Sequence, residues 1–325
     1  MNKNIKYLIL ILTLIFMLAL LSLSLGSIFI SPEKMWSIFT QNKDLPELQI
    51  LLRLRLPRLV MSITLGASLA VSGVIFQSLL KNPLSDPFTI GVSSGSALGA
   101  AVGIILNLNN IWISSLALGG GLAVTSLVYL VARHRQMSTA TLVLSGISLN
   151  FILSSLILLI FSLVKSEQVH KILLWMMGDL SIARYTTLWK ATPFMIIIIF
   201  ISYFYHRHLD LISLGDELSS STGVTKQEKQ NLFWLASILA AIPVALAGVI
   251  GFVGLIIPHL VRYLFGYSHK KVIIFSSFLG ACFLIICDII ARSIAPPYEI
   301  PLGVITGLLG GTFFFMIIIF KRKAV

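Results

Sequence analysis

Few side chains in this sequence stand at spacings that could support catalysis. Its six histidines form no cluster with metal-ligand spacing, and no Ser/His/Asp set or pair of carboxylates can be recognised along the chain. A phosphate-binding P-loop needs the dipeptide Gly-Lys, which never occurs here. The sequence therefore predicts no catalytic residue, no metal site and no cofactor. If ATP drives the protein, a separate subunit must hydrolyse it.

Asp288 is the one carboxylate expected clearly inside an apolar run, and Arg292 follows it at i+4. Residues four apart share one face of a helix, so the two side chains can pair, and a structural ion pair is the favoured interpretation. Carriers driven by protons or sodium usually need buried acidic or polar relays. The near absence of such groups favours an energy source outside the chain.

Arginines crowd the start of the second apolar run, in Leu52-Arg53-Leu54-Arg55-Leu56-Pro57-Arg58. Pro57 suits the first turn of a helix, where its missing N–H would be unsatisfied anyway. Arg292 is expected at the same membrane face, so the arginines would form a basic outer rim, against the positive-inside tendency. Two interpretations remain open, namely docking of an acidic partner and anchoring to lipid phosphates.

The composition shows what must position these residues. Of the 325 residues, 57% are hydrophobic and only 11% are charged, whereas soluble domains carry about 25% charged residues. A chain this apolar needs the bilayer as its solvent. We expect a single transmembrane domain over residues 1–325. The net charge of +12 lies mostly between apolar runs, where it indicates topology and not nucleic-acid binding.

Ten apolar runs predict an all-α, polytopic membrane protein with ten transmembrane helices, because a span needs about 20 apolar residues. The expected spans are 7–30, 59–80, 90–107, 111–132, 140–164, 191–205, 231–250, 252–266, 272–291 and 302–320. A cleaved signal peptide is the alternative for the first run, which is long for that purpose. An even number of spans places both termini on one side, and a weak positive-inside excess makes that side cytoplasmic.

Small residues recur within these runs. Glycines at every fourth position mark the third span at 91, 95, 99 and 103, and the tenth at Gly303, Gly307 and Gly311. Such spacing lets another backbone approach closely. We expect packing within the chain for the third span and, at least as readily, contact with a second subunit for the tenth. Residues 70–75 also resemble 245–250, a weak sign of an inverted repeat.

The longest cytoplasmic connection, about residues 207–230, contains a candidate partner surface. Asp216 and Glu217 suit the first turn of a short helix and Gly223 suits its C-terminal cap, with Leu214 and Gly215 just before it. The helix could dock on a partner, or the segment could be a plain surface loop.

A series of motifs follows in order along nearly the whole chain. They comprise Arg55-Leu56-Pro57-Arg58, Gly66-Ala67, Gly73, Gln77, Asn82-Pro83-Leu84, Pro87, Gly91-Val92-Ser93, Gly251-Phe252-Val253-Gly254-Leu255, Pro258-His259, Arg262, Asp288-Ile289-Ile290-Ala291-Arg292 and Glu299-Ile300-Pro301-Leu302-Gly303-Val304. Together they resemble the FecCD-type permeases of ATP-binding-cassette (ABC) importers.

The resemblance implies a permease subunit in the cytoplasmic membrane that pairs with a second permease subunit, two cytoplasmic ATPases and an extracytoplasmic substrate-binding protein. It assigns docking of the binding protein to Arg55, Arg58 and Arg292, and ATPase coupling to the segment from Leu211 to Gly223. Ser138 and Thr139 match the cytoplasmic gate, where Ala140 replaces a polar residue of some relatives.

The expected function is therefore import of an iron chelate, with siderophores first, then haem, then cobalamin. Whether the dimer is of identical chains is left open. An ion-coupled secondary transporter is the alternative, because an inverted repeat would suit it equally. A membrane-embedded enzyme is disfavoured by the missing catalytic constellation.

Overall fold

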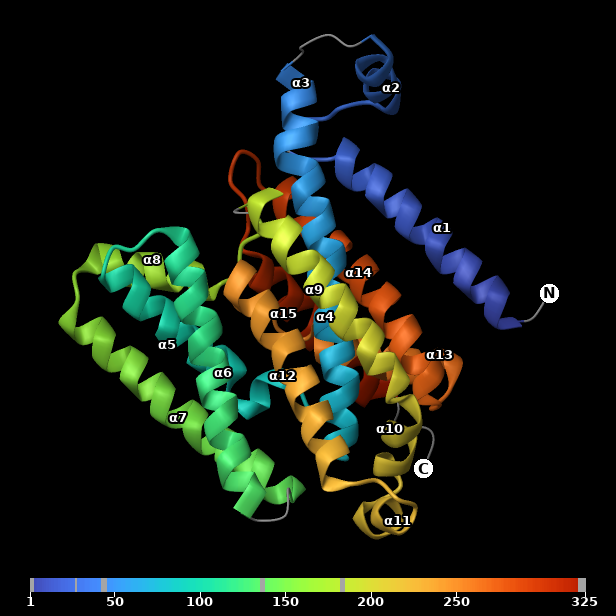
Figure 1. Cartoon of the computed structure of the whole chain (residues 1–325). Coiled ribbons are helices and arrows are strands. Elements are labelled where there is room, and N and C mark those ends of the chain that lie inside the picture. Colours follow the sequence, from blue (N-terminus) through green and yellow to red (C-terminus); the bar gives the residue numbers. More distant parts are fainter. Residues whose placement is uncertain (1–2, 27, 42–45, 135–137, 182–184, 321–325) are drawn as a thin grey trace.

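The structure, a computed structural model, describes residues 3–26, 28–41, 46–134, 138–181 and 185–320. These residues form helices and short connections, with no strand among them (Figure 1). The elements in chain order are α1 (Lys3–Ser24), α2 (Pro32–Gln41), α3 (Pro46–Gln49), the π-helical η1 (Ile50–Arg55), α4 (Leu56–Leu79), the 3-10 turn η2 (Pro87–Ile90), α5 (Val92–Ile105), α6 (Asn110–His134), α7 (Thr139–Leu163), α8 (Ser166–Met176), α9 (Tyr185–Phe204), α10 (His206–Ser213), α11 (Asp216–Ser221), α12 (Lys226–Ala247), α13 (Val253–Phe265), α14 (His269–Ser293) and α15 (Leu302–Phe320).

Each predicted apolar run contains one of these helices. Among the described residues, seven helical segments are long and apolar enough to cross a membrane, at α1, α4, α6, α7, α9, α12 and α14. Shorter apolar helices lie at α5, α13 and α15. The fold is thus all-helical and polytopic, as predicted, while the count of ten crossings stays a prediction.

The two stretches that suggested an inverted repeat differ in local structure. Residues 70–75 lie inside α4, whereas 245–250 cross the end of α12, where Gly248 has φ +72°. The sequence match therefore establishes no structural repeat, and the inverted repeat remains a prediction.

Helix α4 runs through the middle of the molecule and packs against α14, α12, α13 and α9 (Figure 1). Glycines allow two close approaches of the α4 backbone to neighbouring helices. A Cβ built on Gly66 would lie 2.3 Å from the carbonyl oxygen of Gly280 in α14, and one on Gly73 would lie 1.9 Å from that of Gly254 in α13. Gln77 stabilises the contact of α4 with α13, because its side-chain amide donates a hydrogen bond of 3.0 Å to the Gly254 carbonyl oxygen.

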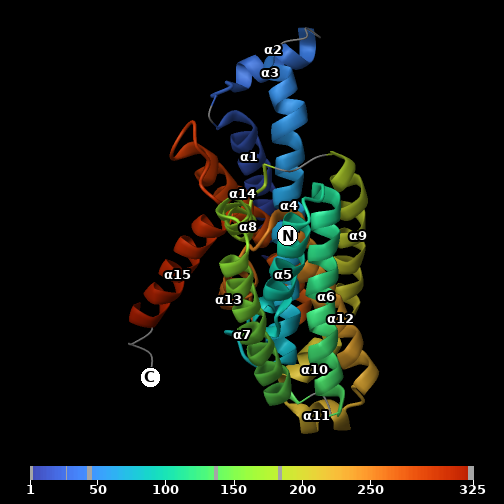
Figure 2. The same ribbon diagram turned by 90° about the vertical axis from the view of Figure 1, so that its left-hand side faces the viewer.

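Helices α5, α6, α7 and α8 form a second group beside this central bundle (Figures 1 and 2). The glycine face of α5 packs on α6, since a Cβ on Gly95 would meet the Gly120 carbonyl oxygen at 2.5 Å and one on Gly99 that of Leu116 at 2.1 Å. The predicted role of the third-span glycines, packing within the chain, is confirmed. Helix α12 joins the two groups through its contacts with α5 and α6.

Substituting Gly73→Ala tests the close approach of α4 and α13. The added methyl meets backbone, which cannot move aside without separating the helices, so we expect a loss of roughly 3 kcal/mol in the free energy of unfolding. Denaturant titration of the purified chain in detergent measures it. Gly119→Ala in α6 is the matched control, because nothing lies within 4 Å of its Cβ position. Equal losses in the two variants would contradict the packing argument.

Candidate functional site

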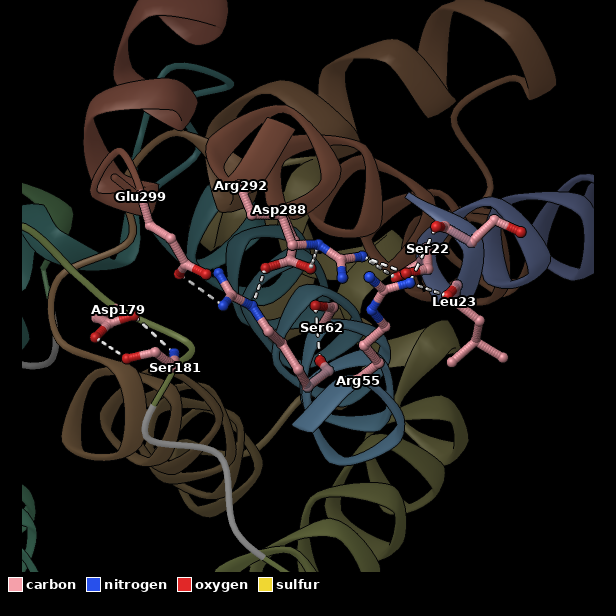
Figure 3. Close-up of polar contacts among 11 residues, drawn as sticks. Ser22, Leu23, Arg55, Ser62, Asp179, Ser181, Asp288, Arg292 and Glu299 are labelled. Atoms are coloured by element: carbon pink, nitrogen blue, oxygen red, sulfur yellow. Dashed lines mark hydrogen bonds and ion pairs between the residues drawn. The ribbon is translucent and has the colours of Figure 1, made fainter. Parts of the chain in front are cut away.

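Five charged residues gather where α4 begins and α14 ends (Figure 3). We call them the arginine network, and they are Arg55, Arg58, Asp288, Arg292 and Glu299. Arg58 Nε donates to Asp288 Oδ1 at 2.5 Å, and its Nη1 donates to Glu299 Oε2 at 2.7 Å. Arg292 pairs with the other oxygen of Asp288 at 3.2 Å, which confirms the predicted i,i+4 ion pair.

The network also holds the end of α1. Arg292 donates to the carbonyl and the hydroxyl oxygens of Ser22, at 2.5 and 2.7 Å. Arg55 donates to the carbonyl oxygen of Leu23 (Figure 3) and to those of Ser24 and Ile28. The last carbonyls of a helix lack partners within it, so the two guanidinium groups satisfy the carbonyl oxygens of Ser22 and Leu23 at the end of α1.

Burial of the three arginines differs from the sequence expectation of an outward-facing rim. Arg55, Arg58 and Arg292 are 5%, 9% and 5% exposed, whereas Arg53 is exposed. Their internal partners explain the difference, because a buried charge needs ion pairs or hydrogen bonds in place of water. Arg58 and Arg292 pair with Asp288, whereas Arg55 donates to backbone carbonyl oxygens. Their docking role is untested by this geometry and stays a prediction. Within the arginine network, Glu299 is the exposed member, with a side chain that is 44% exposed. Arg53, just before the network in the sequence, is exposed as well.

A second polar cluster lies at the opposite ends of the same two helices. Ser78 near the end of α4, His269 at the start of α14 and Asp210 in α10 form one hydrogen-bonded chain. The Ser78 hydroxyl lies 2.7 Å from His269 Nε2, and Asp210 Oδ1 lies 2.7 Å from His269 Nδ1. Asp210 also accepts a hydrogen bond of 2.9 Å from the His269 backbone N–H. We call this chain the histidine clamp.

The histidine clamp has the order of a Ser-His-Asp triad, which the sequence gave no means of recognising. Ser78 and His269 are each only 3% exposed, so a substrate cannot reach the hydroxyl. The clamp instead fixes α10 to the α4–α14 pair. Burial raises the pKa of Asp210, but hydrogen bonds from His269 oppose it and hold that pKa below its ordinary value. At neutral pH the Asp210 carboxylate is therefore ionised and accepts the hydrogen bonds from His269.

The arrangement matches known transport proteins along the whole chain. The model of the FecCD transport family matches residues 12–320. The chain belongs to the FecCD transport family. It is 34% identical over 320 residues to the hemin transport system permease protein HmuU of Yersinia pestis, covering 96% of this chain and 95% of that protein.

Two further similar proteins extend the comparison. Identity is 37% over 265 residues to the cobalamin import system permease protein BtuC of Halobacterium salinarum, covering 80% of this chain and 71% of that one. A solved inward-facing metal-chelate type ABC transporter superposes with a TM-score of 0.87 at 29% identity, over 96% of this chain and 98% of that chain. FecCD proteins are ABC permease subunits, which are not enzymes themselves and work with ATPase and substrate-binding partners. This one is a multi-pass protein of the cell membrane.

The segment from Leu211 to Gly223, which is expected to couple to the ATPases and is called the coupling segment here, contains the short helix that the sequence predicts. Its coupling role stays a prediction. Helix α11 begins at Asp216, and Gly215 and Gly223 take φ values of +124° and +93°, which favour glycine. Leu214 is 63% exposed and Leu218 54%, so two large apolar side chains face outward. The side chains of Asp216 and Glu217 lie outside the described part of the structure.

The remaining predicted residues have identifiable local roles. Ser138 caps α7, where its Oγ accepts from the Thr141 N–H at 3.2 Å, while Met137 beside it lies outside the described residues. Thr139 opens α7. The gate function of Ser138 and Thr139 stays a prediction.

The glycines of α15 divide into two kinds. A Cβ on Gly303 would meet the Met177 carbonyl oxygen at 2.5 Å, so this glycine packs within the chain. Nothing lies within 4 Å of the Cβ positions of Gly307 and Gly311. These two glycines are therefore open to a second subunit, and their role in an interface stays a prediction.

Replacing Asp288 with Asn tests the arginine network. The change leaves Arg58 and Arg292 buried without their shared counter-charge, so we expect a loss of about 3–5 kcal/mol in the free energy of unfolding. Denaturant titration in detergent measures it. Glu167→Gln, which removes the exposed ion pair with Lys171, is the control and should leave unfolding unchanged. An Asp288→Asn variant as stable as this control would overturn the argument.

Proposed function

We propose that the chain is the permease subunit of a binding-protein-dependent, ATP-driven importer that moves an iron chelate into the cell. The family match over residues 12–320 carries the proposal. Ferric siderophores are the first candidate substrate, followed by haem and cobalamin, because relatives are named for hydroxamate, hemin and cobalamin transport. The whole chain serves as one transmembrane domain with ten crossings and both termini in the cytoplasm.

Docking of the binding protein belongs, in this proposal, at the arginine network. Glu299 is the weakly held member, because it is 44% exposed and bonds Arg58 from the outside. An acidic side chain of a partner can take its place on Arg58, and exposed Arg53 adds attraction at longer range. Arg55 and Arg292 act in docking by keeping α1 and α14 in position around Arg58.

Coupling to the ATPases belongs, in this proposal, at the end of α4 and α14 that lies opposite the arginine network. Exposed Leu214 and Leu218 offer apolar anchors to a cytoplasmic subunit. The histidine clamp links their segment to α4 and α14 through Asp210. A push on α11 therefore reaches the central helix pair directly, and the spans rock to open one side and then the other.

A second permease subunit completes the pathway in this proposal. Gly307 and Gly311 face open space in α15, and large apolar residues of α7 such as Phe151 and Leu163 are 71% and 77% exposed. These two helices therefore supply the contact with the second subunit and the walls of the pathway. Ser138 and Thr139 form the cytoplasmic gate at the start of α7. The partner is either an identical chain or a second permease.

The energy source distinguishes this proposal from an ion-coupled secondary transporter. In cells carrying the complete system, we expect uptake of a radiolabelled ferric siderophore to survive an uncoupler and to stop on ATP depletion. An excess of unlabelled haem or cobalamin in the same assay identifies the substrate by competition. Uptake that stops with the uncoupler and survives ATP depletion would support the secondary transporter.

Single cysteines map the two partner surfaces. Both native cysteines, Cys282 and Cys287, are buried, so a surface thiol reacts selectively. Tyr298→Cys lies beside Glu299 at an 80% exposed position and should crosslink to the binding protein only. Leu218→Cys in the coupling segment should crosslink to the ATPase only. Each variant is the control for the other, and exchanged partners would show that the proposed orientation is reversed.

A further inference from the structure

A cavity of about 480 Å³ opens between the N-terminal halves of α6 and α9, with α4 and the end of α12 as its floor. Ile111 and Phe194 in its wall are 74% and 49% exposed, so the cavity is open to the surroundings. None of the residues of the arginine network or the histidine clamp lines it. It is therefore separate from both partner surfaces.

The polarity of the cavity changes with depth along both helices. On α6, Asn110 and Ser114 precede Leu118 at successive steps of four residues, which share one helix face. On α9, Lys190 precedes Phe194 in the same way. Polar groups thus line the end where the two helices begin, and apolar groups line the part toward the middle of the bilayer.

The polar end of the cavity has hydroxyl groups and one positive charge. Lys190 is the only charged residue that lines it, and no described carboxylate pairs with it. The side chains of Ser114, Thr186 and Thr187 make no hydrogen bond within the described residues. The N-termini of α6 and α9 add partial positive charge at the same level.

Two tryptophans place this end at the membrane interface. Trp112 lies in the first turn of α6 beside Ile111, and Trp189 adjoins Lys190 in α9, with exposures of 59% and 77%. Exposed tryptophans near the ends of membrane-spanning helices mark the level of the lipid headgroups. A phosphate at that level can reach Lys190, while an acyl chain from the same molecule lies along Leu118 and Phe194.

We propose that this cavity is a binding site for an anionic glycerophospholipid, whose phosphate is held by Lys190 and the neighbouring hydroxyls and whose acyl chain fills the apolar part. The unbalanced charge of Lys190 favours a headgroup with net negative charge, such as phosphatidylglycerol, over zwitterionic phosphatidylcholine. The site lies at the extracytoplasmic leaflet in the orientation proposed above. Binding itself requires only the membrane placement of the chain and not its transport function.

Native mass spectrometry of the delipidated full chain in neutral detergent tests the proposal. Titration should show that the first phosphatidylglycerol binds about fivefold more tightly than phosphatidylcholine, the factor expected for one lysine at a membrane surface. Lys190→Gln should abolish this preference, whereas Lys190→Arg should keep it. Lys171→Gln in α8 removes another exposed lysine and is the matched control, which should also keep the preference.

Ser114→Trp supplies an independent steric test, because the indole fills the cavity without changing its charge. It should weaken the first bound lipid of either kind. Melting temperatures of all variants verify that they are folded, and Lys190 is exposed, so its substitution is compatible with folding. Equal affinity for the two lipids in the unmodified chain, or an unchanged preference in Lys190→Gln, overturns the proposal. Displacement of the lipid by inorganic phosphate also overturns it, since the site would then bind the free anion.

Discussion

A charge removed from water must be paired, and Asp288 is the residue through which this constraint organises the molecule. Its side chain is fully buried, and Arg58 and Arg292 hold its two oxygens. The pairing joins α4 to α14, and the same arginine from α14 then reaches back to the end of α1 through Ser22. Helices that start more than two hundred residues apart in the chain are thereby fixed at one end of the bundle.

The α4–α14 pair is held at three levels. The arginine network joins the helices at one end, the backbones touch at Gly66 and Gly280 in the middle, and the histidine clamp joins them at the other end. Because all three contacts are short and internal, the pair is suited to move as one body. Asp210 attaches α10, on which α11 packs, to that pair of helices.

Much of the architecture could be predicted from the sequence because the bilayer imposes simple rules. Apolar runs located every long helix, and glycine spacing predicted that α5 packs within the chain, where the structure shows α6 as its partner. The Asp288–Arg292 pair followed from helical periodicity alone. Motif residues such as Gly73 and Gln77, first noticed as a family signature, prove to be the residues that permit and seal the contact of α4 with α13.

The sequence by itself determined the class of protein, the helices of the ten apolar runs and the short helix at Asp216. It could not show that the arginines turn inward, because their partners are helix-end carbonyls and a carboxylate that is 230 residues away from Arg58. Nor could it reveal the histidine clamp, whose three members come from α4, α10 and α14. Only the tertiary structure decided these contacts, because helical periodicity relates neighbours along one helix and carries no information about which helices lie side by side.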